Sequence, residues 1–222
     1  MARWDEVPLH IIDFEGHRSY GVIEFGVVTL LGGHIQSSYT RLCRPQGVIP
    51  RDDTRLHGLT ASSTGNTAPF GEEWGRFVEL RRSGILGAHY ASFESSLLKS
   101  IWAYPPFCPD FLKHGTEKAD WAPWLDTCRM AARVFPGRAS YQLETLVRDL
   151  GLQPTLDDLA ESLCPLRRRR YHAALYDALA AAILLLHCMD QPEWRSVTLH
   201  ALMLAAIAQN EQESTRQASL FD

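Results

Sequence analysis

The order of hydrophobic and polar residues divides the chain into strands first and helices later. Two apolar runs, residues 8–14 and 20–31, are joined by a Gly-His-Arg-Ser turn, and a third run follows at 35–43. Apolar runs of this kind, separated by turn residues, are typical of strands. The opening of the chain is therefore predicted to be an antiparallel meander.

Beyond residue 68, helical periodicity alternates with short apolar segments. Strands followed by such alternation predict an α/β fold, with a mixed sheet that is antiparallel at first, parallel later and flanked by helices. The predicted helices are 69–82, 92–103, 142–150, 173–188 and 193–208; residues 124–135 are predicted to be mostly helical, 85–90 a strand, and 45–53 and 105–119 loops.

Length and composition predict one domain with a short appendage. The chain has 222 residues, of which 45% are hydrophobic, and the domain is predicted at residues 1–208. Residues 209–222 are mostly polar and predict a flexible tail. The chain shows neither a signal-peptide pattern nor an apolar run of membrane length, so a cytoplasmic location without a membrane partner is predicted. The five cysteines form no CxxC pair and indicate neither a disulfide framework nor a zinc site.

The charged residues indicate that an anion would be bound by a few specific arginine side chains and not by the net charge of the protein. The net charge of −4 argues against a protein held on nucleic acid by its total charge. Only three of the 22 basic residues are lysine, and the planar fork of arginine suits phosphate groups. Arg169 and Arg170, in a run of four arginines, are candidate phosphate contacts, although such a run is equally typical of a solvated surface.

Three carboxylates suggest a metal site. Asp13 and Glu15 are two residues apart on a predicted strand, so both side chains lie on the same face. Asp177 stands in a run of Ala, Leu and Ile, where an unpaired buried carboxylate costs several kcal/mol. Oxygen ligands suit Mg²⁺ or Mn²⁺, and two such ions are suited to phosphodiester hydrolysis.

His172 and Glu94 complete this candidate site. Asp177 follows His172 by five positions. On a helix this offset is a net rotation of about 140°, so the two side chains would not share a helix face. His172 is therefore predicted in the loop before the helix, where an imidazole suits a general base. Glu94 lies in a predicted first helical turn, where it is either a fourth ligand or an acid favoured by the helix dipole.

In this order, the motifs resemble those of the DEDD 3′–5′ exonuclease superfamily, in the histidine-containing DEDDh branch that includes RNase T and the proofreading (epsilon) subunit of bacterial DNA polymerase III. The resemblance covers about residues 8–190. It implies an RNase H-like fold, two divalent ions held by four acids, and a histidine base. The matching segments are Asp13-Phe14-Glu15, residues 87–98, and His172 with Asp177-Ala178. They are supported by residues 23–28 (Ile-Glu-Phe-Gly-Val-Val), 57–60 (His-Gly-Leu-Thr), 125–127 (Leu-Asp-Thr) and 141–146 (Tyr-Gln-Leu-Glu-Thr-Leu).

The resemblance also implies residues that contact the substrate end. His57 and Thr60 are candidates, although both also fit turn chemistry. Phe14 and Phe93 are also candidates, although both are more typical of a hydrophobic core than of a platform for base stacking. The full candidate set for substrate binding is Phe14, Gly16, His57, Thr60, Tyr90, Phe93, Arg169 and Arg170.

Two residues depart from the family pattern in the second motif. The family has aspartate where this chain has Glu94, and usually asparagine where it has Tyr90. The extra methylene of glutamate predicts an ion displaced by about an ångström, and a misplacement of that size costs on the order of 10²-fold in rate. The sequence therefore predicts weaker activity or an altered metal preference.

The end of the chain resembles a second known motif. Residues 217–221, Gln-Ala-Ser-Leu-Phe, resemble the peptide with which bacterial replication and repair proteins bind the sliding clamp. Gln217, Leu220 and Phe221 would make the contacts, and the tether would raise the local concentration of the enzyme at DNA.

The sequence as a whole predicts a 3′–5′ exonuclease that acts on single-stranded or frayed 3′ ends, with DNA favoured over RNA because of the tail. One alternative is an RNA-processing exoribonuclease of the same superfamily. Another is a catalytically weakened module that binds nucleic-acid ends. A kinase or synthetase is disfavoured because the chain lacks a glycine-rich phosphate loop.

Overall fold

A computed structural model describes residues 2–207 of the chain. Its core is a five-stranded sheet in the order β3-β2-β1-β4-β7. The first three strands form the predicted antiparallel meander, while β4 runs parallel to β1 and β7 parallel to β4. The prediction of a mixed sheet is therefore confirmed. The strands are β1 (Leu9–His17), β2 (Gly21–Leu31), β3 (His34–Leu42), β4 (Ile85–Ala88) and β7 (Trp124–Asp126).

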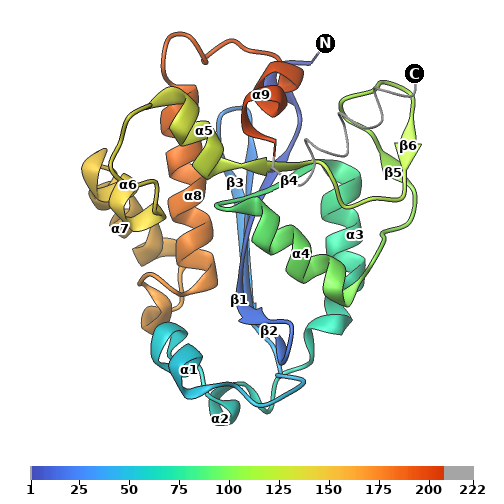
Figure 1. Ribbon diagram of the computed structural model, residues 1–222, viewed down its shortest axis with the longest axis vertical. Helices are drawn as coiled ribbons and strands as arrows, with labels where there is room; N and C mark the ends of the chain where they lie inside the picture. Colours follow the sequence, from blue (N-terminus) through green and yellow to red (C-terminus); the bar gives the residue numbers. More distant parts are fainter. Residues whose placement is uncertain (1, 208–222) are drawn as a thin grey trace.

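Helices cover both faces of this sheet (Figure 1). On one face, α8 (Ala174–Met189) packs on β1 and β2, and α5 (Thr127–Val134), α6 (Leu143–Asp149) and α7 (Gln153–Leu163) pack against α8. The other face carries α3 (Trp74–Ser83) and α4 (Ala91–Ile101). The remaining elements are α1 (Arg51–His57), α2 (Ala61–Thr64), α9 (Leu199–Ala206), the hairpin of β5 (Cys108–Pro109) and β6 (Glu117–Lys118), and the 3₁₀ turns Trp4–Glu6, Phe70–Glu73 and Leu166–Arg168.

The alternation of side chains along β1 separates two hydrophobic clusters. Leu9 and Ile11 belong to the cluster beneath α8, while Ile12 and Phe14 belong to the cluster that contains Phe77 of α3. Period-two alternation produces this division because successive side chains of a strand point to opposite faces. By the same alternation, Asp13 and Glu15 lie on the same face as Leu9 and Ile11, which is the face covered by α8.

Gly26 allows α8 to approach the sheet closely. A Cβ atom built on Gly26 would lie 2.4 Å from backbone atoms of Ala174 and Leu175, so the start of α8 rests directly on β2. Gly26 pairs with Asp13 of β1. The first turn of α8, which contains Asp177, is therefore brought over the acidic end of β1.

Several predicted boundaries differ from the structure. Residues 124–126, predicted within a mostly helical stretch, form β7, and the last helix begins at Leu199 rather than at 193. Thr198 explains the later start, because its hydroxyl accepts the Ala201 N–H at 3.2 Å and caps the helix. The loop predicted at 45–53 contains the start of α1, the loop at 105–119 contains β5 and β6, and α7 was not predicted.

Two further sequence predictions concern cysteines and membranes. All five cysteines lie within the described residues and are free in this structure. Within residues 2–207, no helix has both the length and the apolar character that a membrane crossing requires. The predicted tail, with Gln217, Leu220 and Phe221, lies outside the described residues.

Candidate active site

The acidic end of β1 is shaped by a bulge. The pairing of β1 with β2 shifts between Glu15 and Gly16, and Gly16 lies so close to β2 that a Cβ atom there would be 2.5 Å from the Gly21 carbonyl oxygen. Such a bulge bends a strand and redirects its side chains. Asp13 and Glu15 both line one cleft at this bend.

Glu94 enters the same cleft from α4. The helix starts after Tyr90, which has a left-handed φ of 60°, and the Asp126 side chain accepts the Ala91 N–H at 3.1 Å. Glu94 is only 5% exposed, and its carboxylate accepts the backbone N–H of Phe14. Its Oε2 is buried and has no hydrogen-bond partner within residues 2–207. An unpaired buried carboxylate oxygen is costly, so this atom would be stabilised by a cation or a proton.

His172 lies in the loop before α8, at the place predicted from its spacing to Asp177. Its φ of 60° is unusual for a residue other than glycine and costs on the order of 1–3 kcal/mol. The His172 N–H donates to Asp177 Oδ2 at 2.9 Å, while Asp177 Oδ1 is buried and finds no partner in the described part of the chain. One oxygen of Asp177 thus fixes the backbone of His172, and the other is able to bind a cation.

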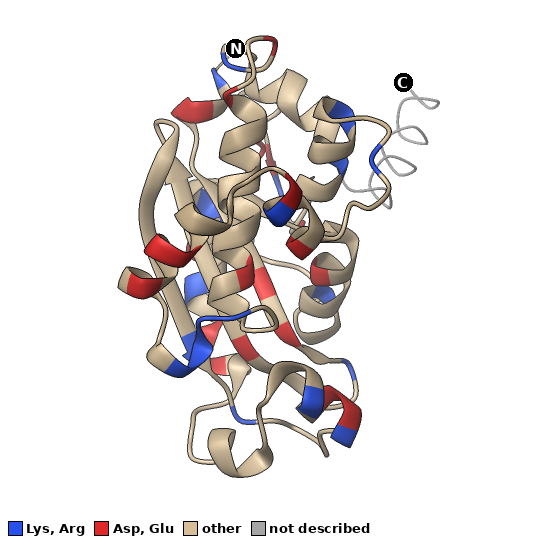
Figure 2. Ribbon diagram, turned by 90° about the vertical axis from the view of Figure 1, so that its left-hand side faces the viewer, with Lys and Arg blue, Asp and Glu red and all other residues tan. Residues whose placement is uncertain are grey.

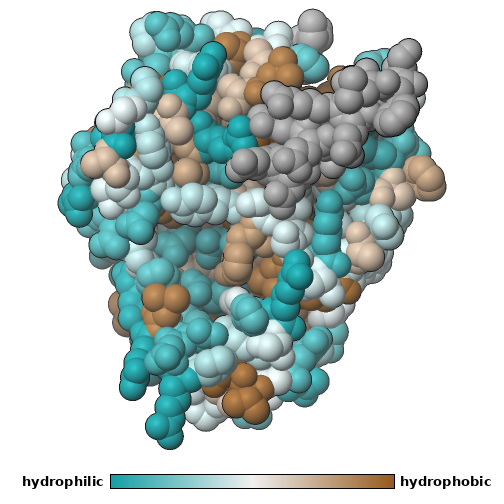
Figure 3. Space-filling model, viewed as in Figure 1, coloured by the Kyte–Doolittle hydropathy of each residue, from teal (hydrophilic) through white to brown (hydrophobic). Residues whose placement is uncertain are grey.

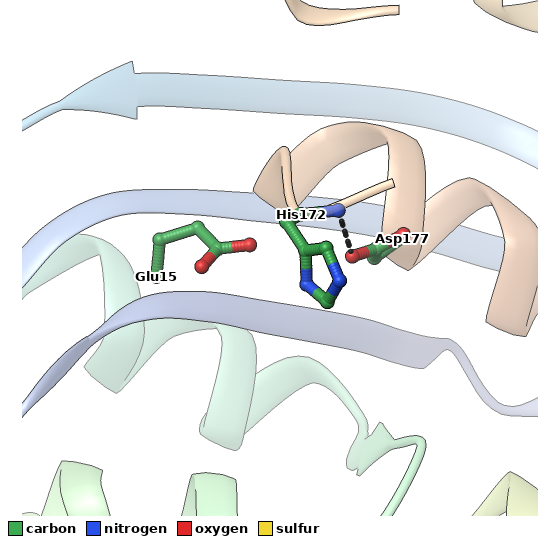
Figure 4. A group of neighbouring side chains, drawn as sticks. All are labelled: Glu15, His172 and Asp177. Carbon is green, nitrogen blue, oxygen red and sulfur yellow. Dashed lines mark hydrogen bonds between the residues drawn. The ribbon is translucent and has the colours of Figure 1, made fainter. Parts of the chain in front are cut away.

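The four acids and His172 line one cleft of about 460 Å³. In this cleft, Glu15, His172 and Asp177 each offer a ligand atom, and these atoms all lie within 4.8 Å of one another. Figure 4 shows the imidazole of His172 between the carboxylates of Glu15 and Asp177. The residues that line the cleft offer mostly oxygen donors, and two of these atoms, Glu94 Oε2 and Asp177 Oδ1, have no hydrogen-bond partner among the described residues. Such a donor set fits Mg²⁺ or Mn²⁺.

Burial and mutual repulsion raise the pKa values of these acids. Burial is the main cause for Glu15, whose pKa rises to about 8, and for Asp177, whose pKa rises to about 7. The pKa values of Asp13 and Glu94 are raised well above their usual range by burial and then by the neighbouring carboxylates. A divalent cation would relieve the repulsion among these carboxylates. Figure 2 shows acidic residues on adjacent strands and basic residues on a loop beside them.

We expect the metal-free protein to lose stability as the pH rises from about 4.5 to about 8, the interval between the ordinary and the raised pKa of Glu15. In this interval the folded state binds more protons than the unfolded chain, so the free energy of unfolding falls with rising pH. Melting temperatures in EDTA between these pH values measure the effect. Addition of Mg²⁺ should stabilise the protein most at the upper end, and Asp13→Asn should flatten the pH dependence. A melting temperature in EDTA that climbs through this interval would contradict the prediction.

The predicted substrate residues occupy different environments. Tyr90 and Phe93 are 48% and 51% exposed and line the cleft, so both are open to a ligand. The face drawn in Figure 3 carries hydrophobic patches among hydrophilic residues. Phe14 is a core residue, in edge contact with Phe70, whereas the interpretation of Phe93 as a core residue is corrected by its exposure. Gly16 forms the bulge described above.

His57 and Thr60 both take part in local backbone structure. His57 is 2% exposed, and its Nδ1 accepts the Leu59 N–H at 3.0 Å. The Thr60 hydroxyl accepts the Ser63 N–H and caps α2. The structure therefore shows turn chemistry at both positions, and their contact with a substrate stays a prediction.

Arg169 and Arg170 are tied to neighbouring backbone. Arg169 donates to the carbonyl oxygens of Glu161 and Cys164, and Arg170 to that of His57. Arg170 remains exposed. Their role as phosphate contacts stays a prediction.

Sequence reasoning gave no role to an ion pair beside the site, between Glu24 of β2 and Arg168. Glu24 pairs with Glu15 across the strands, and the guanidinium of Arg168 forks onto its carboxylate. The available signals were a glutamate inside an apolar strand and the arginine run just before His172. Only the fold brings them together.

No family model matches this chain. Over 164 residues it is 26% identical to the PolC-type DNA polymerase III of Bacillus cereus, a match that covers 74% of this chain and 10% of that protein. Over 133 residues it is 29% identical to the DNA polymerase III subunit epsilon of Treponema pallidum, covering 59% of this chain and 57% of the relative. The chain thus spans less than two thirds of either relative.

The fold is also that of a solved exonuclease. Exonuclease X, in complex with 5′ overhanging duplex DNA, superimposes with a TM-score of 0.61 at 21% identity. The match covers 87% of this chain and 98% of that chain. The predicted RNase H-like fold is therefore confirmed.

Proposed function

We propose that this chain, which belongs to the DEDD exonuclease superfamily, removes nucleotides from the 3′ end of a nucleic acid by hydrolysis. The observation that carries the proposal is the convergence of Asp13, Glu15, Glu94, Asp177 and His172 on one cleft. The four acids come from β1, α4 and α8, and their carboxylates have no role in the hydrophobic core that would offset the cost of their burial.

The four acids would hold two divalent ions, Mg²⁺ or Mn²⁺. When bound, such ions stabilise negative charge on the attacking and leaving oxygens and lower the pKa of water. The support for this assignment is the pair of unpartnered buried oxygens, Glu94 Oε2 and Asp177 Oδ1. The strand places two of the acids and the two helices place the others, so the chain fixes all four before a substrate arrives.

His172 would take the proton of the attacking water. Its pKa is lowered from the usual 6.5, mainly by burial, so the imidazole is neutral and able to accept a proton near neutral pH. The side chain is exposed to the cleft, and its backbone is fixed by Asp177. The exposed rings of Tyr90 and Phe93 would contact the terminal nucleotides of a single-stranded or frayed end.

DNA is the proposed substrate, and replication or repair in the cytoplasm the proposed setting. Two observations support this choice: the two relatives described above are named as a DNA polymerase III and as a subunit of DNA polymerase III, and residues 217–221 resemble a clamp-binding peptide. The tail residues lie outside the described part of the chain. Deletion of residues 217–222 should lower activity only when a sliding clamp is loaded on the DNA, because the tether acts through local concentration.

The function is tested with single-stranded DNA labelled at either its 3′ or its 5′ end, together with matched RNA, in Mg²⁺ and in Mn²⁺. We expect immediate release of the 3′ label and a ladder of products that retain the 5′ label. Asp13→Asn should abolish both signals. Faster degradation of RNA would favour the exoribonuclease alternative, and loss of the 5′ label first would overturn the proposal.

One observation favours a second candidate, a weakened module that binds nucleic-acid ends: Glu94 stands where the family has aspartate. In the structure, however, the longer side chain reaches the Phe14 N–H. We therefore expect Glu94→Asp to lower kcat by about 10- to 100-fold, because the shorter carboxylate withdraws from a site built around glutamate. Activity that rises in Glu94→Asp, with tight end binding but no turnover in the unaltered protein, would support the binding module instead.

A further inference from the structure

The peptide group of His172 is held on both sides. Its N–H donates to Asp177 Oδ2, and its carbonyl oxygen accepts a hydrogen bond from Arg168 Nη2 at 3.0 Å. With a φ of 60°, this backbone lies in a region that persists only where its surroundings enforce it. Arg168 is therefore part of what fixes the direction of the imidazole.

Arg168 is itself anchored inside the protein. Its side chain is 11% exposed and forks onto Glu24, which is 3% exposed, through Nε to Oε1 at 2.9 Å and through Nη2 to Oε2. Its Nη1 donates to the His57 carbonyl oxygen at 2.5 Å. Glu24 in turn accepts the Ala174 N–H at the start of α8 at 3.1 Å. All three guanidinium nitrogens are thus engaged within the protein, with two carbonyl groups and one carboxylate.

We propose that Arg168 is a positioning residue for the hydrolysis proposed above: anchored on Glu24, it fixes the His172 peptide so that the imidazole stays in the cleft, without contacting the substrate. The inference rests on the proposed function of His172. Arg168 thereby has a different role from Arg169 and Arg170, which remain the candidates for contacts with substrate phosphates. Lysine does not replace this arrangement, because a point charge lacks the planar fork that reaches a carboxylate and two carbonyl oxygens together.

The test is a double-mutant cycle between Arg168→Lys and His172→Ala. Arg168→Lys alone should lower kcat by about 10- to 100-fold and leave KM within about twofold, because the base is misplaced while substrate contacts are kept. In the His172→Ala protein, the same change should alter kcat by less than about twofold, because the residue acts through the histidine.

Two results would overturn the proposal. A rise in KM with unchanged kcat would show that Arg168 contacts the substrate. Equal losses in the presence and absence of His172 would show a general effect on the fold. Arg195→Lys, which alters an exposed arginine paired with Asp190 at 2.7 Å, is the matched control and should leave both parameters unchanged.

A second measurement does not depend on activity. Arg168→Lys should speed hydrogen exchange at the amides of His172 and Ala174 by at least about tenfold, while exchange in α5 stays the same. If the unaltered protein shows no hydrolysis, the proposed function fails, but this exchange still decides whether Arg168 holds the loop. Unchanged exchange would overturn the inference. If Arg168→Lys unfolds, the paired variant Glu24→Gln with Arg168→Met removes both charges and takes its place.

Discussion

Asp177→Asn is expected to lower kcat by at least about 10³-fold, because the site would lose one of its four metal-binding charges. The asparagine is close to isosteric, and its carbonyl oxygen can still accept the His172 N–H that Asp177 Oδ2 accepts at 2.9 Å. What the variant removes is the negative charge that would hold a cation at Oδ1, a buried oxygen that no other described residue contacts by a hydrogen bond. Single-turnover hydrolysis of a 3′-labelled strand at saturating Mg²⁺ measures the loss.

The fold of this variant should be intact. Because the pKa of Asp177 is raised by burial and by Glu24, removal of the charge should raise the melting temperature of the metal-free protein near pH 8. Asp158→Asn, an exposed acid on α7, is the matched control and should change neither rate nor stability. Near-normal turnover in Asp177→Asn would show that the cleft does not use this carboxylate for catalysis.

His172→Ala is expected to lower kcat by about 10²- to 10⁴-fold, the usual contribution of a positioned general base. KM and the affinity for Mn²⁺ should change little, because the four acids remain in place. Turnover at neutral pH and titration of Mn²⁺ binding, measured on the same preparation, separate the two effects. Loss of Mn²⁺ binding in His172→Ala would instead make the imidazole a metal ligand, which its grouping with Glu15 and Asp177 within 4.8 Å also allows.

The control for this variant is His114→Ala. His114 is exposed near the β5–β6 hairpin and does not line the cleft. We expect it to keep full activity. If both variants lost activity equally, the loss in His172→Ala would not be evidence for a general base.

Much of the strand architecture followed from local pattern. The alternation around Asp13 and Glu15 correctly placed both carboxylates on one face, because side-chain direction on a strand depends only on residue parity. The five-residue spacing correctly placed His172 before α8, because helix geometry fixes which residues share a face. Elements shaped by local capping and tertiary packing were less predictable: the later start of α9 and the unpredicted α7 show this.

The sequence by itself determined the meander, the helix of Asp177 and the types of chemical group at the site. The resemblance to a known family already grouped the four acids with His172, but only the tertiary structure decided how these groups meet. Gly26 lets α8 rest on β2, so that Asp177 comes over Asp13, and α4 brings Glu94 to the backbone of Phe14. The tertiary structure also decided that Arg168 donates hydrogen bonds to Glu24 and to the His172 carbonyl oxygen. Contacts between residues far apart in the chain depend on how the elements pack, and they leave no periodic pattern in the sequence.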